Sequence, residues 1–232
     1  MRRIHSLLAV QSIVATLVSI NRLGTWTLGY VLPNEFLRWV DFNNMLVLPL
    51  VGLVAFYLLK KTIEYDSPAR EGHSHLALNL GFIVGVYLLA AGYGDHEVTN
   101  YLHARFCLSD STSDLCRIVI FNDDEFSHWI FFTGFVMVNA ALLFLQNLFP
   151  HKEQLAGKDV ALLVANSIFL AAGILANLGF EEIGLDLYVI FLLAIISAYF
   201  LWQHGRQPLF VYYTAAYWMG LAASLVAQVM RF

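Results

Sequence analysis

The stretch LALNLGFIVGVYLLAAGYGDHEVTNYLH, residues 76–103, decides the fold class. Residues 76–93 carry no charged side chain, and a helix of about 20 apolar residues crosses the hydrocarbon core of a bilayer. Helix is the expected form there, because lipid offers the backbone no hydrogen-bond partners. Residues 94–103 are instead rich in His, Asp and Glu. The stretch therefore predicts a membrane helix that ends in a group of polar residues.

Composition extends this prediction to the whole chain. Of 232 residues, 59% are hydrophobic and 13% charged, with a mean hydropathy of +0.66, whereas a soluble domain is about 25% charged. We expect one all-α domain, residues 1–232: a polytopic membrane bundle of about seven transmembrane helices. The expected spans are residues 4–20 (or 4–30 if the first is tilted), 44–59 with a kink at Pro49, 75–94 with a continuation to 103, 126–149, 160–180, 185–202 and 209–230.

The distribution of charge predicts the orientation. With the N-terminus inside, eight of the 13 basic residues, including all four lysines, fall in inner segments, as the positive-inside rule requires. Twelve of the 17 carboxylates then fall outside. We expect an integral, multi-pass membrane protein, in a bacterial inner membrane or a eukaryotic membrane, with its N-terminus inside and its C-terminus outside.

The two cysteines, Cys107 and Cys116, lie in the segment between the third and fourth expected spans. An outer loop in an oxidising compartment favours a disulfide bond over two free thiols. A disulfide here would also support the chosen orientation.

The polar end of the third span has helical spacing. His96, Asn100 and His103 are separated by four and three residues, and residues so spaced share one face of a helix. We therefore expect the two imidazoles to point in the same direction.

A second polar group, NDDEFSHW at residues 122–129, opens the fourth span. Asp124 lies four residues before His128, and Glu125 lies three before it. The loop joins these residues directly to the end of the third span, so the two groups are expected to pack together. Glu181 ends the fifth span on the same side.

Imidazoles and carboxylates at short range are the ligands that zinc and iron prefer. We expect a divalent metal, zinc or iron, with a general base that activates a metal-bound water. The expected ligands are His96, His103, Asp124 and His128, the expected bases are Glu97 and Glu125, and further polar candidates are Asn100, Glu181 and Arg22. This site favours a metal-dependent hydrolase or oxidoreductase acting on a lipid or other amphiphile.

Other interpretations stay open. The histidines could sit in the headgroup zone without a metal, or Arg22 and an acidic partner could belong to a cation or proton transporter. An accessory subunit of a membrane complex, or a homo-oligomer, is also compatible with the chain. The sequence lacks phosphate-binding, Cys-x-x-Cys and nucleophile-elbow motifs. Its basic residues are few and scattered, so we expect the lipid bilayer and a membrane-associated small molecule, not nucleic acid, as partners.

Overall fold

The computed structural model describes residues 1–65, 72–180 and 184–230, and within these ranges it contains helices but no β-strand. Seven helical segments in the described chain are long and apolar enough to cross a membrane. The predicted all-α, seven-span class is thereby confirmed. Membrane insertion and the orientation of the termini stay predictions.

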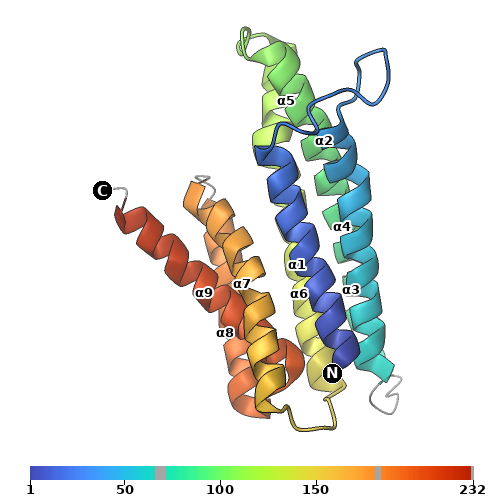
Figure 1. Ribbon diagram of the computed structural model, residues 1–232, viewed down its shortest axis with the longest axis vertical. Coiled ribbons are helices and arrows are strands. Elements are labelled where there is room, and N and C mark those ends of the chain that lie inside the picture. Colours follow the sequence, from blue (N-terminus) through green and yellow to red (C-terminus); the bar gives the residue numbers. More distant parts are fainter. Residues whose placement is uncertain (66–71, 181–183, 231–232) are drawn as a thin grey trace.

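The seven segments follow one another up and down the bundle (Figure 1). Three of them contain a short π-helix, labelled η, either between two α-helices or at the end of the segment. The elements are α1 (Arg2–Leu23); α2 (Trp39–Phe42), η1 (Asn43–Val47) and α3 (Leu48–Tyr65); α4 (His73–Leu102) and η2 (His103–Cys107); α5 (Asp114–Phe121), η3 (Asn122–Phe126) and α6 (Ser127–Leu148); α7 (Gly157–Phe180); α8 (Gly184–His204); and α9 (Pro208–Met230).

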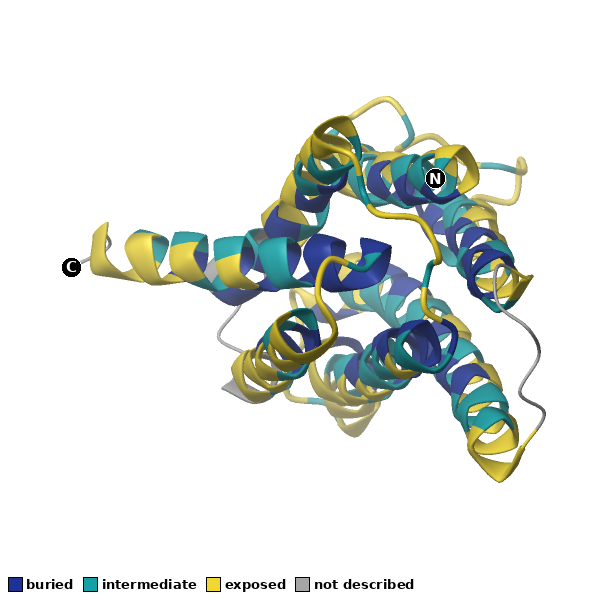
Figure 2. Cartoon of the chain, turned by 90° about the horizontal axis from the view of Figure 1, so that it is seen from below, coloured by how far each residue is buried: buried dark blue, intermediate teal, exposed yellow. Residues whose placement is uncertain are grey.

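The helices form two groups (Figure 1). Helices α1, α3, α4 and α6 run side by side, and α7, α8 and α9 form a second group that meets the first mainly through α1 and α6. Leucines such as Leu59, Leu142 and Leu193 are fully buried between helices. Figure 2 shows buried residues on inward faces and exposed ones on outward faces. Many exposed residues are large and apolar, as expected of surfaces in contact with lipid.

Glycines allow α4 and α6 to pack closely against each other. A Cβ atom at Gly134 would lie 2.5 Å from the backbone nitrogen of Leu89, and one at Gly92 would lie 2.8 Å from that of Phe131. Small residues let membrane helices approach this closely. The crossing brings the end of α4 beside the start of α6, and we call this part of the bundle the His/Asp end.

Two span boundaries differ from the expected ones. The extension of the first span to residue 30 is wrong, because α1 ends at Leu23 and the backbone of Gly24 is extended. The second span begins at Trp39 and contains the π-helix η1, which ends two residues before Pro49; the kink expected at Pro49 stays a prediction. Proline supplies no N–H to the helical ladder, and a π-helical turn is a common way to accommodate such an interruption.

The expected loop between the third and fourth spans is mostly helical. The third span continues to His103, as predicted, and extends beyond it to Cys107. After the short connection at residues 108–113, α5 and η3 lead without a break into α6. The His/Asp end is therefore a helical hairpin whose two arms are joined by only six non-helical residues, 108–113.

Candidate functional site

Asp123 lies at the centre of the candidate site. Its side chain is buried, with Oδ1 3.0 Å from Nδ1 of His96 and Oδ2 2.9 Å from Nδ1 of His103. The Asn100 amide donates to Oδ2 at 3.5 Å. The predicted face of His96, Asn100 and His103 is confirmed, because all three contact this one carboxylate.

The π-helix η3 explains why Asp123, and not Asp124, faces α4. In a π-helix the hydrogen bonds run from i to i+5, so residues five apart share a face. Asp123 lies five residues before His128 and is buried, whereas Asp124, four residues before it, is exposed. Reasoning from α-helical spacing selected Asp124 and missed Asp123. Only the acidic run at residues 123–125 marked the position in the sequence.

Arg22, in the last turn of α1, joins this group from the other side. Its Nη1 donates to Nε2 of His96 at 3.0 Å, and its Nη2 donates to Oε1 of the buried Glu97 at 2.5 Å. Because a guanidinium only donates hydrogen bonds, Nε2 of His96 accepts and the imidazole proton lies on Nδ1, next to Asp123. Arg22 thus has an acidic partner, Glu97, although the first span does not extend to residue 30, the condition under which the sequence predicted such a partner.

His128 lies beside His96. The two rings are 5.0 Å apart in an edge-to-face arrangement, and Phe132 lies one turn farther along α6. Glu125 is exposed. The predicted candidate Glu181 lies outside the described residues. The structure thus brings the histidines His96, His103 and His128 to one end of the bundle, as expected.

Three side chains could hold a metal ion together. One ligand atom each from His103, Asp123 and Asp124 lies within 4.8 Å of the others. An ion at the middle of such a triangle would be at most about 2.8 Å from each atom, compared with bonds of about 2.0–2.2 Å in zinc sites. Small side-chain rotations would bring the three ligand atoms to bonding distance from one ion. Two of the expected ligands, His103 and Asp124, belong to this group, while His96 adjoins it through Asp123.

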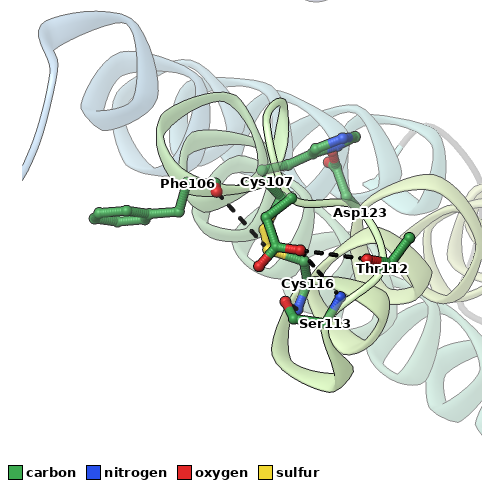
Figure 3. The surroundings of a disulfide bond; sticks show 8 residues. Phe106, Cys107, Thr112, Ser113, Cys116 and Asp123 are labelled. Carbon is green, nitrogen blue, oxygen red and sulfur yellow. Dashed lines mark hydrogen bonds and ion pairs between the residues drawn. A yellow bond between two sulfur atoms is a disulfide. The ribbon is translucent and has the colours of Figure 1, made fainter.

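The predicted disulfide between Cys107 and Cys116 is present, with sulfur atoms 2.04 Å apart (Figure 3). It ties the end of η2 to the first turn of α5. Ser113 caps α5 by accepting a hydrogen bond from the Cys116 backbone N–H at 3.4 Å. The disulfide and the helix cap both constrain the start of α5, and Asp123 lies in η3, directly after α5.

The segment from Gly24 to Arg38 is fastened to the same end. Tyr101 and Arg105 both donate to the backbone carbonyl of Glu35. Arg38 forms two hydrogen bonds of 2.8 Å with Asp41, and these bonds raise the pKa of the Arg38 guanidinium above its usual value. Arg38 is therefore a permanent cation in a structural ion pair.

Comparison with known proteins identifies no relative of this chain. No family model matches the chain, and neither the curated proteins nor the solved structures contain a match. The functional argument therefore rests on the geometry of the His/Asp end.

Proposed function

We propose that the chain is an integral membrane enzyme that binds a divalent metal, zinc or iron, at its His/Asp end. The observation that carries the proposal is the convergence of His103, Asp123 and Asp124, whose ligand atoms lie within 4.8 Å of one another. With the N-terminus inside, as the basic residues favour, this end faces the outer side. The substrate is then a lipid or other amphiphile that reaches the site from the outer leaflet.

The donor set suits hydrolytic metal chemistry. Catalytic zinc sites use three protein ligands and leave one position for water, whose pKa falls to about 7. Outside the ligands, His96 lies against Asp123 and is itself held by Arg22. Contacts of this kind orient the ligands of a metal and tune its affinity.

The two predicted general bases differ in how easily each could accept a proton. Glu97 would have to release Arg22 before it could accept a proton, because Arg22 Nη2 donates to its Oε1 at 2.5 Å. Glu125 is exposed and follows the ligand Asp124 directly in the chain, so it needs no such rearrangement. We therefore favour Glu125 as the general base of the proposed reaction.

Metal analysis of the purified protein tests this function. We expect about one zinc or iron ion per chain in the wild type, and loss of the ion in His103→Ala and Asp123→Asn, which remove ligands. His75→Ala is the matched control, since His75 also contacts a largely buried carboxylate, Glu64, but lies at the opposite end of the bundle. Equally low metal content in all four proteins, after incubation with zinc and with iron, would exclude the metal site.

A cation or proton transporter is the second candidate. It is favoured by the continuous chain of contacts from Arg22 through His96 and Asp123 to His103. The chain stays at one end of the bundle, and the interior beneath it is mostly apolar. In liposomes, cation-dependent flux that is lost in Asp123→Asn would support transport, whereas lipid turnover without flux would support the enzyme.

A further inference from the structure

A partly open cavity of about 300 Å³ lies between the two groups of helices. All seven long helical segments contribute side chains to its wall, and most of these are apolar. The volume is at the lower limit of small-molecule binding sites, about 300–1,000 Å³. It is about twice that of a cavity that takes one benzene, so it would hold about a dozen carbon atoms.

The upper part of the cavity adjoins the candidate metal site. Tyr93 lines the cavity from α4, three residues before His96, and Phe132 lines it from α6, four residues after His128. Three or four residues of helix correspond to about 5 Å along the axis. The apolar interior therefore begins one helical turn below the His/Asp group.

The cavity is elongated along the bundle. On α1 its wall extends from Ser19, one turn before Arg22, down to Leu8. Eleven residues of helix span about 16 Å. A narrow cavity of this length suits an extended chain better than a compact ring system.

Three polar side chains of the wall already donate hydrogen bonds to the backbone. The Gln11 amide donates to the Gly52 carbonyl at 2.7 Å, Ser12 donates to the Leu8 carbonyl at 3.1 Å, and Asn139 donates to the Phe135 carbonyl at 2.7 Å. These bonds satisfy donors that would otherwise attract water or a polar ligand. What they leave is a wall suited to hydrocarbon.

We propose that this cavity binds a single hydrocarbon chain, namely the tail of the amphiphile whose head group reaches His103 and Asp123. The inference rests on the proposed function for the identity of the head-group site, and it narrows the substrate class to molecules with one chain of about a dozen carbons in the cavity. Seating the tail one turn below the metal ligands places the polar bond of the substrate at the metal.

A cavity-filling variant tests the proposal without using catalysis. Gly173 lines the cavity from α7, and a Cβ atom there would meet nothing within 4 Å. Gly173→Leu therefore fills the cavity without forcing the helices apart. Gly81→Leu is the matched control, because Gly81 on α4 has equally open space around it and does not line the cavity.

The probe is cis-parinaric acid, a fluorescent fatty acid, titrated into metal-free protein in detergent micelles. We expect Gly173→Leu to weaken binding by about tenfold or more, because the pocket loses the volume that the chain fills, and Gly81→Leu to bind like the wild type. His103→Ala should lose the metal but keep the fatty acid, which separates this inference from the proposed function. Thermal unfolding of each variant checks that it is folded.

Photo-crosslinking with a diazirine-labelled fatty acid in bilayers excludes adventitious lipid. Labelling of cavity residues such as Phe131, Phe135 and Ile174 that falls in Gly173→Leu would support the proposal. Unchanged fatty-acid affinity in Gly173→Leu, or labelling confined to outward-facing residues such as Leu80 and Ile83, would overturn it. The first result would exclude the cavity as the binding site, and the second would mean that the chain contacts only bulk lipid.

Discussion

The two ends of the helix bundle each place a carboxylate beside histidine, but with different neighbours. At the end where α3 stops, Glu64 accepts hydrogen bonds on Oε1 from Lys60 at 2.5 Å and His75 at 2.8 Å, and its Oε2 lies 3.5 Å from Lys61. Two lysines therefore neutralise Glu64.

Asp123, at the His/Asp end, is held by two imidazoles instead. His96 and His103 lie at 3.0 and 2.9 Å, and among the described residues no lysine or arginine pairs with Asp123. A second carboxylate, that of Asp124, is close enough to bind the same metal ion as Asp123. A neutral imidazole has a nitrogen lone pair that can bind a metal, which an ammonium group lacks.

The difference shows how similar residue types serve two purposes. The Glu64 group is a closed ion-pair network that fastens α3 to α4. The Asp123 group has an excess of carboxylate that a divalent cation would neutralise. Perturbing the two groups separately should therefore change different observables.

The largest effect on stability is expected at the Glu64 group. Glu64→Gln removes the carboxylate and leaves the Lys60 ammonium, whose side chain is only 7% exposed, without its counter-charge. We expect a loss of about 3 kcal/mol in the free energy of unfolding, measured by reversible denaturation in detergent micelles, with metal content unchanged. Lys61→Ala, at a side chain 52% exposed, is the control and should cost at most about 0.5 kcal/mol. Loss of metal in Glu64→Gln would break the comparison.

Adding zinc should stabilise the protein through the Asp123 group. Zinc at about one hundred times its dissociation constant stabilises a folded protein by about 2.7 kcal/mol. We expect this gain in the wild type and in Glu64→Gln, its absence in Asp123→Asn, and its reversal by a chelator. Denaturation with and without zinc measures it. Equal stabilisation of the wild type and Asp123→Asn would mean that zinc binds elsewhere.

Much of the fold could be predicted from the sequence, because apolar runs of membrane-spanning length are a strong signal. The seven spans and the Cys107–Cys116 disulfide follow from hydropathy and from cysteine position. The shared face of His96 and His103 follows from α-helical spacing. In each case the physical rule depends on residues close together in the chain.

The rest of the site depends on features that local rules miss. A π-helix shifts the helical register by one residue, and the composition of NDDEF does not predict a π-helix. The sequence therefore indicated Asp124, whereas the structure buries Asp123. The cavity is equally hidden, because its wall combines residues from seven helical segments. Spacing along one helix cannot reveal a space between helices.

The disulfide should contribute next to the stability of the His/Asp end. Cys107 and Cys116 are nine positions apart, and closing such a ring stabilises a protein by about 2.5 kcal/mol in the chain-entropy model. We expect the double variant Cys107→Ser/Cys116→Ser to lose about this amount and to bind zinc more weakly, because the hairpin before Asp123 is less constrained. Denaturation and metal titration, with and without reductant, check both effects. A reductant should leave the double variant unchanged, and equal stability of wild type and variant would contradict the prediction.

The smallest effect, and the one that tests how the site is held, is expected at the α4–α6 crossing. A Cβ atom at Gly134 would meet backbone at 2.5 Å, whereas one at Gly81 would meet nothing within 4 Å. Gly134→Ala should therefore force the helices apart and cost about 1–2 kcal/mol, while Gly81→Ala should be neutral or slightly stabilising. Because the crossing sets the distance between His96 and Asp123, Gly134→Ala should also weaken zinc binding, even though Gly134 touches no ligand. If Gly134→Ala lowers stability but leaves zinc affinity intact, the hairpin and its disulfide alone hold the ligands, and the packing of α4 on α6 supports the fold without shaping the site.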